Sequence, residues 1–310
     1  MSDITKAPLI KWSGSKRKQA PQIVEYFPQH IHTYYEPFLG GGSVFHELLN
    51  QVYEGSIKVD RFVCGDLNED LMNIWKVFLN DSNKLFDYYC DHRDTLFKYS
   101  GLTSYDLKID KDHIKAASKF YYEERERFNH MLKSDPERPL LFFWITKTCF
   151  NGLIRYNPRG DFNVPYHVAG GLGQTPENLE KVMDAWKEVM KGQDIQFICD
   201  SYDNIIRNAK QFDIVYLDPP YSNFTGMYFA NSFDKEHLFY ELYCLNSTDV
   251  QWFLSYDGKT GEEDRTENVP HNLYSKHVYI NSGVSNFKKL KSKSVGTSAN
   301  DIVYDSLYIS

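Results

Sequence analysis

The sequence lacks the features that place a chain in a membrane or in the secretory pathway. None of its apolar runs approaches the roughly 18 residues of a membrane-spanning helix. Residues 1–11 contain no apolar core of the kind that signal peptides carry. The five cysteines are scattered, odd in number and form no CxxC pair, which favours reduced thiols and no metal site. We therefore expect a cytoplasmic protein with an ordinary hydrophobic core.

Positive charge is also scarce, and several catalytic signatures are missing. The chain has 35 Lys and Arg residues against 42 Asp and Glu residues, a net charge of −7, which argues weakly against nucleic-acid binding. A local basic face can still bind DNA, so the distribution of charge matters more than its sum. The segment His46–Asn50 lacks the second histidine of HExxH, no GxSxG occurs, and Gly14–Lys16 lacks the first glycine of a phosphate-binding loop. These absences disfavour a metalloprotease, a serine hydrolase and a P-loop nucleotidase.

The two ends of the chain contain an alternation of strand and helix patterns. An extended, aromatic-rich segment at 31–38 is followed by a glycine turn and then by helical spacing over 43–52. After Thr175, strand patterns at 195–199 and 213–217 alternate with helical ones. Such alternation predicts an α/β fold whose mostly parallel sheet has helices on both faces.

The middle of the chain has a different texture. From about Asp81 the pattern is mostly polar helix, rich in tyrosine, lysine, glutamate and arginine. A turn-rich stretch between short extended runs predicts a hairpin near 153–165. We therefore predict a catalytic domain formed by 1–80 and 174–310 and an inserted helical domain over 81–173.

A glycine turn and an acidic residue predict a site for an adenosine-containing cofactor. The segment Phe38–Gly42 joins the first strand to its helix, and its glycines let backbone amides approach a ligand closely. Alone, this turn is weak evidence. Asp66 ends the next strand, where a carboxylate can accept hydrogen bonds from both hydroxyls of a ribose. Asp66 could also cap the following helix, and the two functions are compatible.

The tetrapeptide Asp218-Pro219-Pro220-Tyr221 follows an apolar strand and predicts the reaction centre. Two prolines explain a stiff turn but not the flanking Asp and Tyr. The carboxylate of Asp218 and the carbonyl of Pro219 could both accept hydrogen bonds from the exocyclic amine of a nucleobase. That would localise the nitrogen lone pair and stabilise positive charge during methyl transfer, and the prolines would fix the geometry. Tyr221 could stack on the base, which would have to be flipped out of a duplex.

Two further segments contain candidate binding residues. Within Lys11–Lys16, Trp12 could pack on an adenosyl group and Lys16 could pair with a carboxylate, although an exposed basic segment explains the pattern as well. The stretch 287–294 contains four lysines and no acid. It could form part of the basic cleft that the net charge conceals, and a solvated loop is the alternative.

These elements, in this order, resemble the Dam-type, alpha-class family of DNA adenine-N6 methyltransferases over roughly residues 9–235. Lys11–Lys16 is similar to the family's KWxGxK, with Ser15 where the family often has Gly. Arg155–Tyr166 is similar to the family's RYNxxGxFNVP element in its recognition domain. The other similar segments are the cofactor loop, the acidic ribose position, the next strand end and the catalytic tetrapeptide, at Glu36–Ser43, Cys64–Asn68, Cys199–Tyr202 and Asp218–Tyr221.

The resemblance implies a doubly wound, Rossmann-like methyltransferase sheet with an inserted, mainly helical DNA-recognition domain. It implies S-adenosylmethionine as cofactor, S-adenosylhomocysteine as product and double-stranded DNA as substrate, with catalysis by the tetrapeptide. The cofactor-binding residues that it implies are Trp12, Lys16, Phe38, Gly40, Gly42, Asp66, Asp200, Tyr202 and Asp218. The hairpin residues that it implies for DNA contacts are Arg155, Tyr156, Asn157 and Arg159. The lysine-rich stretch adds Lys288, Lys289 and Lys291 as candidates for the same task.

The target and the biological setting leave alternatives. An Asp at the first position of the tetrapeptide favours adenine over cytosine N4. A cytosine-N4 or RNA amino methyltransferase, or a catalytically inactive DNA-binding module on the same fold, is the alternative reading. The resemblance also fits restriction-modification or the modification of phage and host DNA, in which a cognate restriction endonuclease would be a partner. Neither the recognition sequence nor the oligomeric state follows from these motifs.

Overall fold

The computed structural model describes residues 7–102, 111–168, 172–220, 233–261, 263–284 and 302–310. Their packing divides into two compact units, each of which is considered by itself. The sheet unit contains the described residues of Lys16–Leu67, Gly192–Phe224 and Ser232–Ser310. The helical unit contains the described residues of Met1–Ser15 and Asn68–Lys191.

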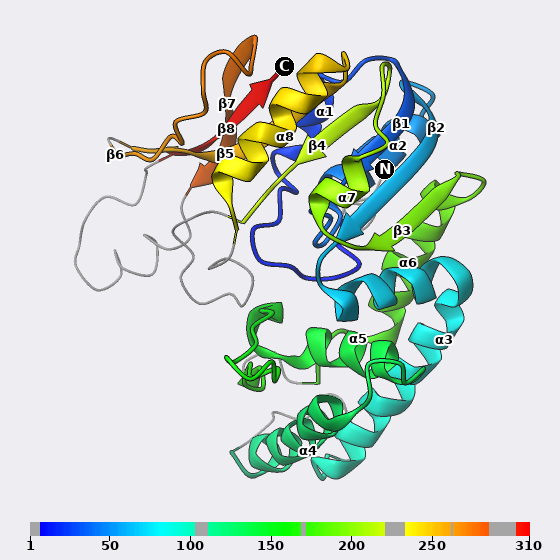
Figure 1. Cartoon of the computed structure of the whole chain (residues 1–310). Coiled ribbons are helices and arrows are strands. Elements are labelled where there is room, and N and C mark those ends of the chain that lie inside the picture. The colour runs from blue at the N-terminus through cyan, green and yellow to red at the C-terminus, as the bar shows by residue number, and fades with distance from the viewer. Residues whose placement is uncertain (1–6, 103–110, 169–171, 221–232, 262, 285–301) are drawn as a thin grey trace. The chain divides into compact units, whose positions relative to one another are not determined.

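The sheet unit is built on one sheet with the strand order β3-β2-β1-β4-β5-β8-β7 (Figure 1). The first five of these strands are parallel to one another; they are β1 (His30–Glu36), β2 (Lys58–Asp66), β3 (Ile195–Cys199), β4 (Ile214–Leu217) and β5 (Gln251–Thr260). The remaining strands are antiparallel; they are β8 (Ile302–Ile309), β7 (Lys276–Val284) and the short β6 (Glu263–Asp264), which pairs with β5. The predicted α/β fold with a mostly parallel sheet is confirmed.

The order of the strands determines where a ligand can bind. From β1 the chain passes to β2 and β3 on one side, whereas β4 and β5 lie on the other side. Open α/β sheets bind ligands at the carboxyl ends of the strands that flank such a reversal. Here those ends are Glu36 of β1 and Leu217 of β4, so the glycine turn and the catalytic tetrapeptide follow neighbouring strands at the same edge.

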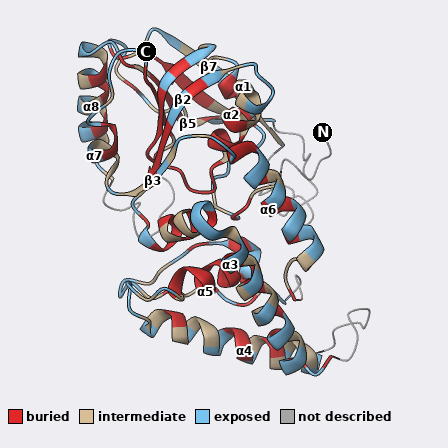
Figure 2. Cartoon of the chain, turned by 90° about the vertical axis from the view of Figure 1, so that its right-hand side faces the viewer, coloured by how far each residue is buried: buried red, intermediate tan, exposed pale blue. Residues whose placement is uncertain are grey.

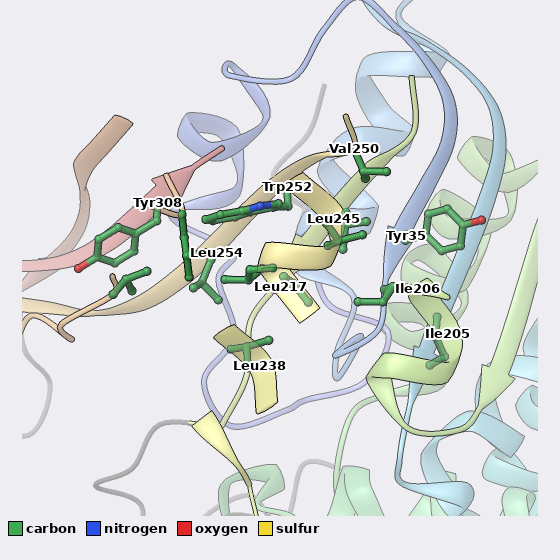
Figure 3. Packing of buried hydrophobic residues seen from close by; sticks show 14 of the residues in the cluster. Tyr35, Ile205, Ile206, Leu217, Leu238, Leu245, Val250, Trp252, Leu254 and Tyr308 are labelled. Atoms are coloured by element: carbon green, nitrogen blue, oxygen red, sulfur yellow. The ribbon is translucent and has the colours of Figure 1, made fainter. Parts of the chain in front are cut away.

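Alternate residues of the strands supply a core on each face of the sheet. On one face, Leu217, Trp252 and Leu254 pack with side chains of α7 (Tyr202–Ile206) and α8 (Lys235–Ser247) (Figure 3). The other face packs against α1 (Ala20–Val24) and α2 (Ser43–Tyr53). There Phe45 of α2 lies edge-on to Phe62 of β2, with ring centroids 5.6 Å apart. Both faces are thus covered, as a doubly wound sheet requires.

The helical unit contains α3 (Glu69–Tyr99), α4 (Lys111–His130), α5 (Arg138–Thr148), the 3-10 turn η2 (Phe150–Gly152) and α6 (Pro176–Met190). Every residue of the apolar α5 is buried, whereas α4 has a broad exposed face (Figure 2). α3 begins after Asn68, whose side chain accepts the amide of Leu71, and has a kink at Asp81, where the texture of the sequence changes. Thr175 caps α6 ahead of Pro176, which confirms the predicted helix start.

A tight loop in the helical unit occupies the position of the predicted hairpin. Antiparallel bridges join Tyr156 to Phe162 and Cys149 to Tyr166, without extended strands. The amide of Asn157 donates to the carbonyl of Asp161 at 2.8 Å across its tip. The loop is therefore hairpin-like, but it is held by a few bonds and by its buried side chains.

The packing units and the predicted domains have different bounds. The described residues of Met1–Ser15 and the helix α6 pack in the helical unit, and α3 begins ahead of the predicted boundary at residue 81. The division into a catalytic and a target-recognition domain concerns function and stays a prediction. No helix among the described residues is both long and apolar enough to span a bilayer.

Candidate active site

The glycine turn after β1 contacts the acidic residue at the end of β2. Gly40 and Gly42 have φ values of 49° and 65°, a left-handed conformation that favours glycine. The amide of Gly40 donates to Oδ2 of Asp66 at 3.0 Å, and the amide of Leu39 donates to the carbonyl of Gly65 at 2.8 Å. The structure thus brings together two motifs that the sequence predicts for one cofactor site.

Gly65 is required at this place for a reason that the motifs did not indicate. A Cβ there would collide with Cδ1 of Ile205 and with the carbonyl oxygen of Ile198. Helix α7 can therefore lie directly on the end of β2 only because residue 65 has no side chain. That close packing places the start of α7, and Tyr202 with it, beside the glycine turn.

Three aromatic rings form a group next to the turn. Phe38 stacks on Tyr202 with ring centroids 5.2 Å apart and an interplanar angle of 27°. Phe233 lies edge-on to Phe38 at 5.9 Å and tilted against Tyr202 at 5.8 Å. All three rings are only partly buried, so they offer apolar surface for a flat ring system. The sequence predicted Phe38 and Tyr202 but missed Phe233, which carries no motif.

Asp200 is exposed and is tied into the loop between β3 and α7. Its Oδ1 accepts the side-chain amide of Asn204 at 2.9 Å and the backbone amide of Ser201 at 2.8 Å. These bonds hold the pKa of the Asp200 carboxyl below its usual range. The carboxylate is therefore ionised at neutral pH, and its nearest function is to shape the loop that precedes Tyr202.

Asp218 follows β4 and pairs with the lysine of the N-terminal motif. The Nζ of Lys16 lies 2.9 Å from Oδ1 of Asp218, and the two side chains are 5% and 20% exposed. Backbone amides of Gln19 and Ala20 donate to the carbonyl of Lys16 at the start of α1, which fixes its backbone. Pro219 is buried and Pro220 half-buried; Tyr221 lies outside the described residues.

Glu36 places a second carboxyl group beside Asp218. It is 3% exposed at the end of β1, and the hydroxyl of Tyr34 donates to its Oε2 at 2.7 Å. Burial, with a further contribution from the charge of Asp218, raises the pKa of Glu36 to about 8. Glu36 is therefore mostly protonated at neutral pH, and the carboxylate that pairs with Lys16 is that of Asp218.

The N-terminal segment that contains Trp12 lies in the helical unit. Leu9 and Ile10 are fully buried there. The Nζ of Lys147 donates to the carbonyl of Leu9. Burial, with the nearby charge of Lys11, lowers the pKa of Lys147 to about 7. Trp12 itself is half-buried, and its contact with a cofactor stays a prediction.

The two arginines of the hairpin-like loop are exposed. The Nε of Arg155 donates to Oδ1 of Asn163 at 2.7 Å, which orients its guanidinium. Arg159 is 85% exposed at the tip, with its Nε 3.4 Å from a carboxylate oxygen of Asp161. Both guanidinium groups are accessible to phosphates or base edges. Lys288, Lys289 and Lys291 lie outside the described residues.

The other two loop candidates have structural partners. The Oδ1 of Asn157 accepts the amides of Arg159 and Asp161, at 2.9 and 3.0 Å, which closes the turn. The hydroxyl of Tyr156 donates to Oδ2 of Asp70 at 3.2 Å, and burial, with the charge of Asp70, raises the pKa of that hydroxyl. The structure thus explains both side chains without DNA, and their DNA contacts stay a prediction.

Asp70, which sequence reasoning missed, holds this loop to the helices. It is 2% exposed and receives Nε of Arg138 at 2.7 Å and Nζ of Lys133 at 2.8 Å. Burial alone would raise the pKa of Asp70, but the hydrogen bonds of these two cations outweigh it and lower the pKa. In the sequence, Asp70 cannot be distinguished from an ordinary acidic residue in the first turn of a helix.

The described residues of the sheet unit fit an adenosyl cofactor. Asp66 carries a carboxylate, the acceptor group that ribose hydroxyls require, and it contacts the glycine turn through the amide of Gly40. The ring group of Phe38, Tyr202 and Phe233 suits a purine. The left-handed glycines leave the turn free of side chains. This chemistry agrees with the cofactor type that the motifs predict.

Comparison with known proteins gives a consistent family. A model of the D12 class N6 adenine-specific DNA methyltransferases matches residues 12–292. The chain is 34% identical to a type II methyltransferase, M.MjaIII, of Methanocaldococcus jannaschii over 69% of this chain and 68% of that protein. It is 33% identical to a DNA adenine methylase of Serratia marcescens, over 72% of each chain. It is 31% identical to a DNA adenine methylase of Escherichia coli K12, over 73% of this chain and 71% of that one.

Proposed function

The chain belongs to the D12 class of N6 adenine-specific DNA methyltransferases, and we propose from this that its reaction centre is the tetrapeptide at 218–221. In this proposal Asp218 and the carbonyl of Pro219 activate the adenine amine for methylation. The enzyme is an adenine-specific DNA methyltransferase, and its substrate is DNA. The observation that supports this assignment of the reaction centre is the position of Asp218. It follows β4 at the edge where the glycine turn follows β1. It is 20% exposed, pairs with Lys16 and lies beside Glu36, whose pKa is raised to about 8.

The amine of adenine is a weak nucleophile because its lone pair is delocalised into the ring. Acceptance of its two N–H groups by Asp218 and Pro219 turns the lone pair toward the methyl donor. The same acceptors stabilise the positive charge that develops on the nitrogen, and they are already in place before the reaction. Pro219 is buried and its φ is fixed by the ring, so the position of its carbonyl is well defined. Tyr221 is proposed to stack on the flipped base.

The cofactor is proposed to be S-adenosylmethionine, which supplies a methyl group on a positively charged sulfur when bound. Asp66 would bind its ribose hydroxyls, and Phe38, Tyr202 and Phe233 its adenine. Lys16 would bind its carboxylate, and the backbone of Gly40 and Gly42 would approach it closely. Asp200 and Trp12 are proposed as further contacts. S-adenosylhomocysteine is then the product.

The helical unit is proposed to hold the DNA. Arg155 and Arg159 are exposed cations on a loop that is fixed by Asp70 through Tyr156. An exposed guanidinium on a fixed loop can contact a phosphate or read a guanine edge. We propose double-stranded DNA as the form that is bound, with Lys288, Lys289 and Lys291 as additional phosphate contacts.

The setting is proposed to be restriction-modification or the modification of host or phage DNA. Three of the similar proteins are named type II methyltransferases, and others are named DNA adenine methylases. A cognate restriction endonuclease is the partner that this setting implies, and a cytoplasmic location follows from the same proposal. Sequencing the modified bases of DNA from a host that expresses the enzyme would identify the recognition sequence.

The reaction centre is tested by the variants Asp218→Ala and Asp218→Asn. We expect the rate of methyl transfer to DNA to fall by at least about 10³-fold in both, because the charged acceptor is lost. The affinity for S-adenosylmethionine, measured by calorimetry, should change far less. Near-normal turnover of Asp218→Ala would overturn the assignment of the reaction centre.

The methylated base is tested by mass spectrometry of nucleosides from the wild-type product. These should contain N6-methyladenine, and N4-methylcytosine would refute the assigned base.

A further inference from the structure

Lys16 lies within reach of two carboxylates, only one of which belongs to the catalytic tetrapeptide. Its Nζ is 2.9 Å from Oδ1 of Asp218 and 4.0 Å from Oδ2 of Asp305. Lys16 is 5% exposed and Asp305 is 14% exposed. A shift of the ammonium by about the difference between these distances would exchange one carboxylate for the other. The backbone of Lys16 need not move, since α1 begins on its carbonyl.

Asp305 is held in place by groups other than Lys16. The Nε2 of Gln19 donates to Oδ2 of Asp305 at 2.7 Å and to Oγ of Ser282 at 2.9 Å. On β5, Asp257 is the direct cross-strand partner of Asp305. Two like charges opposite one another in a sheet destabilise it. Burial, followed by the charge of Asp305, raises the pKa of Asp257, which reduces the repulsion within this pair.

Both strands next to Asp305 are irregular at this level. β5 bulges between Asp257 and Lys259, and β7 shifts register between Asn281 and Gly283. Gly258 lies at the first bulge, where a Cβ would collide with the backbone of Tyr304. Bulges redirect side chains and are enriched next to active sites. Both irregularities lie on the Tyr304 side of the Asp257–Asp305 pair, within two residues of Asp305.

The electrostatics of methyl transfer give this arrangement a function, which rests on the proposed role of Asp218. When the adenine amine attacks, positive charge develops on its nitrogen while it is hydrogen-bonded to Asp218. An ammonium on the same carboxylate repels that charge and weakens the carboxylate as an acceptor. Lys16 therefore holds the Asp218 carboxylate in place before the base arrives, but opposes the reaction if it stays there.

We propose that Asp305 is a positioning residue that draws the Lys16 ammonium away from Asp218 when the adenine amine binds. Lys16 then remains paired, because it moves from one carboxylate to another. Its ammonium has three N–H donors, so it can keep its proposed contact with the cofactor's carboxylate during this exchange. Asp218 gains full acceptor strength only when the base is present. The residue acts through Lys16 and does not itself contact the substrate.

The first test is Asp305→Asn, which keeps the shape and the bond to Gln19 but removes the charge. In single-turnover assays at saturating S-adenosylmethionine and DNA, we expect the transfer rate constant to fall about tenfold. The Kd for S-adenosylmethionine, measured by calorimetry, should stay within about twofold. Asp305→Glu should restore most of the rate. Asp264→Asn, which removes another Asp that pairs with a lysine in the same sheet, should leave rate and Kd unchanged.

The second test combines Asp305→Asn with Lys16→Met. If Asp305 acts through Lys16, the Asn substitution should have no further effect on the transfer rate in the Lys16→Met background. A normal rate in Asp305→Asn, or an equal loss with and without Lys16, would overturn the proposal. So would a loss that lies in the cofactor Kd. A functional Asp218→Ala enzyme would instead refute the proposed reaction centre, so the two failures are distinguishable.

Discussion

The two units of the molecule use carboxylates in opposite ways. In the helical unit, Asp70 is 2% exposed, and its carboxylate accepts hydrogen bonds from Arg138, Lys133 and Tyr156. In the sheet unit, Asp218 is 20% exposed and its cation, Lys16, also lies near Asp305. A carboxylate that is bonded on all sides by fixed donors holds structure together. One whose counter-ion has a second partner can give up that ion and bind something else.

Arg138→Met should have the largest effect on stability. It leaves the Asp70 carboxylate buried beside only Lys133 and Tyr156, and breaking such a pair costs about 3–5 kcal/mol. It also frees the carbonyl of Phe128, which accepts Nη1 of Arg138 at 2.7 Å. Denaturant unfolding measures the loss. We expect DNA affinity to fall with it while S-adenosylmethionine binding survives, because the cofactor residues of the sheet unit keep their contacts.

Lys133→Met is the matched control, because Lys133 bonds the same carboxylate but is 56% exposed. Loss of the Lys133 ammonium should lower the free energy of unfolding by less than about 1 kcal/mol. Equal losses from the two variants would show that burial does not distinguish the two cations. Equal loss of cofactor binding in Arg138→Met would show that the two units do not respond independently.

Glu36→Gln should change the pH dependence of stability through the sheet unit. The folded chain raises the pKa of Glu36 from 4.5 to about 8, so it holds a proton that the unfolded chain releases. The free energy of unfolding of the wild type therefore falls as pH rises through that interval. Relative to Glu36→Gln, the wild type should lose on the order of 2–4 kcal/mol between pH 4.5 and 8. Denaturation series at several pH values measure this. The exposed Glu54→Gln should give a curve parallel to wild type, and a parallel curve for Glu36→Gln would contradict the raised pKa.

Arg159→Ala should have the smallest effect, and only on DNA. Its guanidinium is exposed, so stability should hardly change, whereas loss of one phosphate contact should weaken binding by about 1 kcal/mol. The slope of log affinity against log salt should fall by about one. Lys187→Ala removes another exposed cation of the same unit, which is 43% exposed and also pairs with an Asp. This control should leave both quantities unchanged. An unchanged salt slope in Arg159→Ala would exclude a phosphate contact.

Much of the fold and part of the candidate site could be read from local patterns. The strand at 214–217, the turn at 38–42 and the start of α6 all lie where the sequence predicts them, because each depends on residues near one another in the chain. Gly40 and Asp66 could be paired in advance because parallel strands end at a common edge. Phe233, Asp70 and Asp305 could not be predicted, because they carry no motif themselves and their partners are distant in sequence.

The sequence by itself determined the fold class, the reaction chemistry and the residues that belong to motifs. The fold class follows from periodicity and turn chemistry, whereas the reaction chemistry and the motif residues also rest on the resemblance of these segments to a known family. Only the tertiary structure decided which of the candidates are free to act. In the folded chain Tyr156 is hydrogen-bonded to Asp70, Arg159 is exposed, and Lys16 lies between Asp218 and Asp305. The physical reason is that burial and pairing of charge depend on residues brought together across the fold, and these set the pKa, the exposure and the mobility of each functional group.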